Sequence, residues 1–212
     1  MRRLPVYLLL DNSFSMKGEP IEALKEGVQL LTSTLRQDPY ALETVCVSII
    51  IFNTKAEQIT PLTDLVAFQM PDIKADGVTA LGEAMSLLAR RVEQEVIKTT
   101  HEKKGDWKPL IFIMTDGAPT DDWKAGFNEL QKIKKAMVIS CAAGEGARID
   151  VLKEISDVVV ELKKADSETI KKFFKWISAS VGTTSKKVDL TKKDISSFNE
   201  LPPPPPEISV VP

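Results

Sequence analysis

Three side chains with hard oxygen atoms stand at alternate positions directly after an apolar run. Asp11, Ser13 and Ser15 follow residues 4–10, a nearly continuous apolar segment that is typical of a strand buried on both faces. A curved loop can point a carboxylate and two hydroxyls at this spacing toward one centre. Ligands of this kind suit Mg²⁺, Ca²⁺ or Mn²⁺ better than zinc. The spacing therefore predicts a site for a hard divalent cation.

A second strand end supplies another carboxylate. Asp116 comes at the end of the apolar segment 110–115, and ligands of open α/β sheets bind at the carboxyl ends of the strands. If hydroxyls bind the cation directly while Asp11 and Asp116 act mainly through water, the cation keeps part of its positive charge. Such a cation favours a carboxylate from another molecule.

Strand-like and helix-like segments alternate along most of the chain. We expect strands at residues 4–10, 44–52, 56–61, 110–115, 136–143 and 157–162. We expect helices from Pro20 to the Asp38-Pro39 stop, from Thr79 to about Lys98, over residues 123–133 and 149–155, and from Ser167 onward. The alternation predicts an α/β fold built on an open sheet. The short connection between the second and third strands predicts one antiparallel strand at the sheet edge.

The apolar periodicity fades from Gly182 onward. Five consecutive prolines at residues 202–206 cannot donate backbone hydrogen bonds and favour an extended polyproline II conformation. We therefore divide the chain into a domain over residues 1–181 and a proline-rich tail over residues 182–212. The tail is either a spacer or a segment that docks on another protein or on this sheet.

Composition narrows the class of protein. The chain has 212 residues, of which 43% are hydrophobic and 27% charged, as in soluble globular proteins. Its 28 Lys and Arg are balanced by 30 Asp and Glu, so the chain has no overall positive charge that would attract nucleic acid. No apolar segment has the roughly 18 residues that a membrane span needs. Cys46 and Cys141 lie in apolar runs, which is typical of free, buried thiols. We expect a cytoplasmic protein.

Three motifs resemble the metal-ion-dependent adhesion site (MIDAS) of von Willebrand factor A domains. In chain order they are Asp11-x-Ser13-x-Ser15, Thr79 within residues 77–81, and Asp116 within residues 114–117. The resemblance implies a three-layer, doubly wound, mostly parallel sheet with one antiparallel edge strand. It also implies direct ligation by Ser13, Ser15 and Thr79, with Asp11 and Asp116 acting mostly through water. It implies Mg²⁺ as the ion, with Ca²⁺ or Mn²⁺ as alternatives, and a Glu or Asp of a partner protein as the last ligand. The chain would then be a metal-dependent binding module without catalytic activity.

Longer segments resemble the TerY-type family of bacterial tellurium-resistance proteins. They are residues 4–11, 38–44, 105–109 and 115–123, and the resemblance covers roughly residues 2–180. It implies a stress-response or phospho-signalling assembly with a protein kinase and a PP2C-type phosphatase as partners. Many relatives have Gly where this chain has Phe14, which either narrows access to the cation or adds contact area. With two cysteines, the chain has no counterpart of the cysteine-rich zinc module of some members.

Two other interpretations compete with the cation site. In the simplest, Asp11 and Ser13 cap a turn, and residues 115–117 are an ordinary strand-to-loop transition. In the other, the chain is a Mg²⁺-dependent phosphatase of the haloacid dehalogenase type, which also places an Asp after a buried strand. That chemistry needs a second acid two residues after Asp11, and the serine at this position does not act as a general acid near neutral pH.

Overall fold

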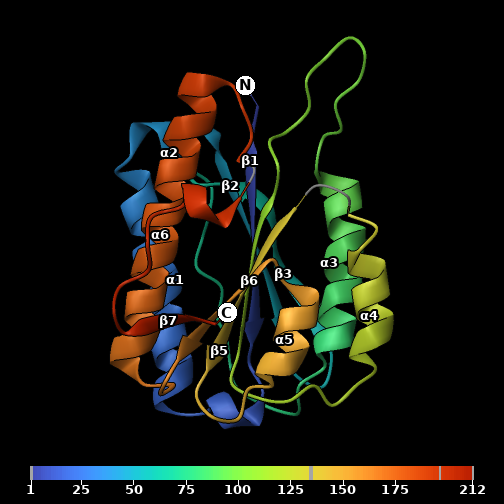
Figure 1. The fold of residues 1–212 in the computed structure, drawn as a ribbon, viewed down its shortest axis with the longest axis vertical. Helices are drawn as coiled ribbons and strands as arrows, with labels where there is room; N and C mark the ends of the chain where they lie inside the picture. The colour runs from blue at the N-terminus through green and yellow to red at the C-terminus, as the bar shows by residue number, and fades with distance from the viewer. Residues whose placement is uncertain (1, 134–135, 196, 212) are drawn as a thin grey trace.

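The computed structural model describes residues 2–133, 136–195 and 197–211, and it places one mixed sheet between two layers of helices (Figure 1). The strands are β1 (Leu4–Asp11), β2 (Val45–Phe52), β3 (Ala56–Asp64), β4 (Leu110–Thr115), β5 (Met137–Ala143), β6 (Val158–Leu162) and β7 (Ile208–Val211). The α-helices are α1 (Glu19–Arg36), α2 (Pro39–Thr44), α3 (Leu81–Glu95), α4 (Trp123–Leu130), α5 (Ile149–Ile155) and α6 (Ser167–Thr191). Two short 3₁₀ helices are η1 (Phe14–Met16) and η2 (Phe198–Glu200).

Helices cover both faces of the sheet, which confirms the predicted three-layer α/β fold. Figure 1 shows α1, α2 and α6 on one side and α3, α4 and α5 on the other. The strand order is β3-β2-β1-β4-β5-β6-β7, with parallel pairing from β2 to β6. The strand β3 is antiparallel at one edge, as predicted. The structure adds a second antiparallel edge strand, β7, which pairs with β6.

The central strand β1 is buried along its whole length. Val6, Leu8 and Leu10 point into the core beneath α1 and α6, while Tyr7 and Leu9 point into the core beneath α3. Because both faces are covered, neither set of side chains meets water, and this explains the continuous apolar run in the sequence.

The order of strands reverses beside β1. The chain places β2 and β3 on one side of β1, and β4 to β7 on the other. Doubly wound sheets bind ligands at such a reversal, outside the carboxyl ends of the strands. The carboxyl ends of β1 and β4 therefore carry the candidate residues.

The structure differs from the predicted boundary after residue 181. Helix α6 continues to Thr191, because Thr184, Ser185 and Val188 are buried on its inner side. Two of these residues are polar, and the hydroxyl of Thr184 bonds the backbone O of Ser180 at 2.8 Å, so the helix stays buried without an apolar periodicity. The loss of apolar spacing near Gly182 therefore marks a change in side-chain type within one helix.

The chain after α6 lies on the domain. Nε1 of Trp176 donates a hydrogen bond to the backbone O of Pro202 at 2.8 Å, and Ile208 is buried where β7 joins β6. Of the two roles left open for the tail, the structure has it docked on this sheet. Among the helices of the described residues, none combines the length and the apolar character of a membrane span.

Candidate metal centre

The candidate carboxylates lie at the ends of neighbouring strands. Asp11 is the last residue of β1, and Asp116 follows β4 directly. The two strands are parallel and in register, with Leu10 opposite Met114. Both carboxylates therefore reach the same end of the sheet, which is the end away from the N-terminus in Figure 1.

One of the two serines donates a hydrogen bond to the carboxylate of Asp116, and the other serine bonds the first. The hydroxyl of Ser15 donates to Oδ1 of Asp116 at 2.8 Å, and the hydroxyls of Ser13 and Ser15 lie 3.0 Å apart. Ser15 and Asp116 are 101 positions apart in the chain, so their contact depends on the tertiary fold.

Asp11 is fixed from two directions. One carboxylate oxygen accepts the backbone N–H of Ser13 at 2.8 Å, and the other accepts the hydroxyl of Thr115 at 2.5 Å. The side chain is completely buried. Thr115 was not among the predicted site residues, although its position immediately before Asp116, at the end of a strand paired with β1, was a usable signal.

Thr79 approaches the same loops from the start of α3. A Cβ atom on Gly117 would lie 3.2 Å from Oγ1 of Thr79, so the hydroxyl lies against the residue that follows Asp116. Two hydrogen bonds with Thr120 hold Thr79 there. The backbone N–H of Thr79 donates to the hydroxyl of Thr120 at 3.2 Å, and the backbone N–H of Thr120 donates to the carbonyl of Thr79 at 2.9 Å. All five predicted residues thus gather at one end of the sheet.

The segment before Thr79 is tied to the loop after β1. The backbone N–H of Phe14 donates to the carbonyl of Gly77 at 3.0 Å, and that of Asp76 donates to the carbonyl of Asn12 at 2.9 Å. The side-chain amide of Asn12 also donates to the carbonyl of Lys74 at 2.7 Å. Gly77 has a φ of 71° and a Cβ there would collide with Thr54, so a glycine is needed for this path. Asn12 is a second positioning residue absent from the predictions.

Burial makes the ionised carboxylates costly without a cation. Loss of solvent raises the pKa of Asp11 to about 6, against the opposing effect of its hydrogen bonds from Ser13 and Thr115. Burial also raises the pKa of Asp116, with the hydrogen bond from Ser15 opposing it. A cation at this end of the sheet favours the ionised form of both groups.

The donor set fits a hard divalent cation. The five side chains offer carboxylate and hydroxyl oxygens and no nitrogen or sulfur, which is the chemistry of Mg²⁺, Ca²⁺ or Mn²⁺ sites. In the part of the chain that the structure describes, no group of three or more His, Cys, Asp or Glu is placed to hold a metal. A cation at this end therefore depends on hydroxyl ligands.

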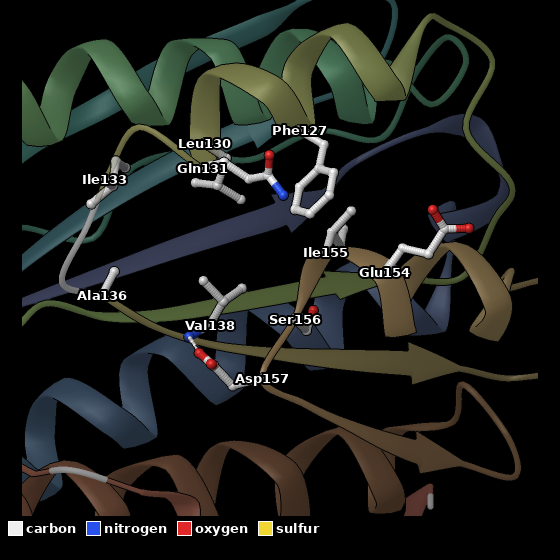
Figure 2. A pocket seen from close by; sticks show the side chains of 10 residues that line it. All are labelled: Phe127, Leu130, Gln131, Ile133, Ala136, Val138, Glu154, Ile155, Ser156 and Asp157. Carbon is white, nitrogen blue, oxygen red and sulfur yellow. Dashed lines mark hydrogen bonds between the residues drawn. The ribbon is translucent and has the colours of Figure 1, made fainter.

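Two surface cavities lie toward the opposite end of the sheet. One, of about 250 Å³, lies between α4, α5 and the start of β5. Figure 2 shows the carboxylate of Asp157 in this cavity turned toward the backbone of Val138, whose N–H it accepts at 2.8 Å. The other, of about 500 Å³, is lined by Trp107 and the end of α3. Neither cavity is lined by any of the five candidate residues.

Sequence comparison decides the family. The model of the von Willebrand factor type A domain matches residues 6–176. The chain belongs to this family. Von Willebrand A domains are generally non-enzymatic protein-interaction modules. A curated relative, the uncharacterized protein sll0103 of Synechocystis sp., is 30% identical over 123 residues, which are 55% of this chain and 26% of that protein. The chain thus matches about a quarter of that relative's length.

Solved structures share the von Willebrand A fold. A von Willebrand factor type A protein from Catenulispora acidiphila has a TM-score of 0.64 at 16% identity, over 86% of this chain and 43% of that one. The ArnB paralog VWA2 from Sulfolobus acidocaldarius has a TM-score of 0.60 at 18% identity, over 87% and 45%. Proximal thread matrix protein 1 from the mussel byssus, solved with a zinc-occupied MIDAS motif, has a TM-score of 0.61 at 15% identity, over 84% and 48%. At these identities the likeness concerns the fold.

Proposed function

We propose that this von Willebrand A domain binds a protein partner through a divalent cation. Ser13, Ser15 and Thr79 would hold the ion directly, and Asp11 and Asp116 would act mainly through bound water. The observation that carries the proposal is the hydrogen bond from Ser15 to Asp116 across the ends of β1 and β4, with the hydroxyl of Ser13 bonded to that of Ser15. The zinc-occupied MIDAS motif of the mussel protein, on a similar fold, supports a metal at this place.

The chemistry of the ligands supports an acidic partner residue. Three of the proposed ligands are neutral hydroxyls, so a bound cation keeps much of its positive charge and attracts a carboxylate of another protein. Mg²⁺ is the proposed ion because it accepts few protein ligands and keeps several waters. Ca²⁺ and Mn²⁺ suit the same oxygen ligands.

The proposal includes no catalytic step. Both oxygens of Asp11 accept hydrogen bonds from the protein, and the side chain is completely buried. A nucleophilic aspartate of a haloacid dehalogenase-type phosphatase needs an oxygen that can reach a phosphoryl group. The placement of Asp11 therefore favours a role in holding the site over a role as nucleophile.

The wider setting is proposed from the sequence. We propose a cytoplasmic protein, which fits the two buried free thiols of Cys46 and Cys141. A tellurium-resistance or stress-response role remains a prediction, as do a protein kinase and a PP2C-type phosphatase as partners.

The proposed function predicts cation-dependent capture of a partner. The full chain, immobilised and exposed to cell lysate, is expected to retain at least one protein in Mg²⁺ and to release it in EDTA. The variant Ser13→Ala/Ser15→Ala is expected to retain none in either condition, because two proposed ligands are gone. As a matched control, Ser33→Ala changes an exposed serine of α1 and should capture like the wild type. Equal capture by the double variant in Mg²⁺ would contradict the proposal.

The pKa of Asp11 predicts opposite pH effects on metal binding and on the metal-free fold. Mg²⁺ affinity is expected to fall as pH drops through about 6, where Asp11 takes up a proton. Without metal, an unfolded Asp ionises near pH 4, whereas the folded protein holds this proton up to about 6. The metal-free fold should therefore lose on the order of 2–3 kcal/mol of stability as pH rises through that window.

Thermal melts in EDTA and in Mg²⁺ between pH 4 and 7, compared with Asp11→Asn, measure both effects. The variant has no titrating group at this position and isolates the contribution of Asp11. If wild type and Asp11→Asn show the same pH dependence in EDTA, the assigned pKa of Asp11 is wrong.

A further inference from the structure

Two exposed apolar side chains stand beside the candidate metal centre. Phe14, between the two serines, is 61% exposed, and Val78, next to Thr79, is 50% exposed. The hydrogen bond from the N–H of Phe14 to the carbonyl of Gly77 joins their loops. The two side chains therefore border the same site from two different loops, and we call them the apolar collar.

The exposure of Phe14 favours one of its two expected effects, added contact area. A ring folded over the cation site would pack against the surrounding loops and become buried. It would also bury the neighbouring Ser15. Instead the ring is mostly in solvent and Ser15 is exposed, while Ser13 on the other side of Phe14 is buried. Phe14 therefore adds exposed apolar contact area at the rim of the site.

Charged groups on the rim limit the kind of partner. Lys17 places its Nζ 5.2 Å from the centroid of the Phe14 ring. Asp76 and Glu145 are exposed acids on two loops that contact the site. The backbone N–H of Asp76 donates to the carbonyl of Asn12. The loop of Glu145 packs against the carbonyl of Asp116 through Gly146. Lys17 can attract one carboxylate, while the two acids repel a partner segment with several negative charges. One carboxylate with uncharged, apolar neighbours meets no such repulsion.

We infer that the apolar collar selects a partner segment in which a single Asp or Glu is flanked by bulky apolar side chains. The carboxylate would reach the cation while the apolar neighbours cover Phe14 and Val78. Burying these side chains on association removes apolar surface from water and adds affinity beyond the carboxylate contact. The inference rests on the proposed function, since the carboxylate needs the cation.

The test uses short capped peptides of matched length. One peptide has Asp between two leucines, a second has Asp between two serines, and a third has Asn between two leucines. In saturating Mg²⁺, the full chain is expected to bind the leucine-flanked Asp peptide about tenfold more tightly than the serine-flanked one, as measured by NMR titration. The Asn peptide should not bind.

The variant Phe14→Ala/Val78→Ala is expected to lose the preference for leucine while keeping the Mg²⁺ affinity of the wild type. Val66→Ala is the matched control, because Val66 is also exposed, at 74%, but lies away from the metal site. The carbonyl of the adjacent Leu65 accepts a hydrogen bond from Arg36 at the C-terminal end of α1. It should keep the preference.

Separate results distinguish the collar from the metal site. If the protein binds Mg²⁺ but shows no preference for the leucine-flanked Asp peptide, binds neither Asp peptide, or keeps the preference in the Phe14→Ala/Val78→Ala variant, the collar is overturned. The proposed function then stands on its own tests. If a direct Mg²⁺ titration of the wild type shows no binding, the proposed function fails, and the collar fails with it.

Discussion

Replacing Ser13 and Ser15 together by Ala is expected to reduce Mg²⁺ affinity by about 100-fold or more, with no loss of fold. The two hydroxyls lie 3.0 Å apart and one of them bonds Asp116, so the change removes two proposed ligands from one place. Neither hydroxyl belongs to the apolar core, and Ala fits the space of Ser. Isothermal titration with Mg²⁺ measures the affinity, and circular dichroism checks the fold.

A control separates loss of ligands from a general effect of losing serines. Ser33→Ala removes an exposed hydroxyl of α1 that bonds only the carbonyl of Leu30, and it should bind Mg²⁺ like the wild type. Retention of wild-type affinity by the Ser13→Ala/Ser15→Ala protein would show that the cation, if bound, is held elsewhere.

A chain that ends at residue 181 is expected to be severely destabilised. The cut removes the last part of α6 and the strand β7, and with them the buried side chains of Val188, Ile195, Leu201 and Ile208. Burial of each such side chain contributes about 1.5–3 kcal/mol, against about 5–15 kcal/mol for a whole domain. The truncated segment regains conformational entropy, which offsets part of this loss. We expect a melting temperature lower by about 10 °C or more, or an insoluble product.

The exposed end of α6 provides the control for truncation. Leu190 is 60% exposed, and Leu190→Ser in the full chain should change stability by about 0.5 kcal/mol or less. Calorimetry on the three proteins makes the comparison. A truncated chain that melts at the temperature of the full chain would show that residues 182–211 do not stabilise the domain.

The sequence predicted most of the fold because its strands are buried on both faces. A run such as that of β1, apolar up to Asp11, is typical of a covered central strand. The end of the domain was harder to place. The inner side of α6 changes from Phe173 and Ile177 to Thr184 and Ser185, and an analysis of apolar periodicity does not detect a helix buried through hydroxyls.

The candidate site was predicted for similar reasons, with limits of its own. Its five residues carry oxygen atoms at strand ends, which a sequence displays directly. Thr115 and Asn12 were missed because their roles depend on which strands and loops meet in the fold. The hydroxyl of Thr115 on β4 donates to Asp11 on the neighbouring strand β1, and the amide of Asn12 donates to the carbonyl of Lys74. The importance of Val78 likewise appears only when the hydrogen bond between Phe14 and Gly77 is known.

The most direct test of the account is a crystal structure of the full chain grown with Mn²⁺, with the ion located by its anomalous signal. We predict a single strong peak at the carboxyl ends of β1 and β4, about 2 Å from the hydroxyl oxygens of Ser13, Ser15 and Thr79. A protein that takes up no Mn²⁺ there, or an ion bound at another place with these hydroxyls unliganded, would contradict the central claim.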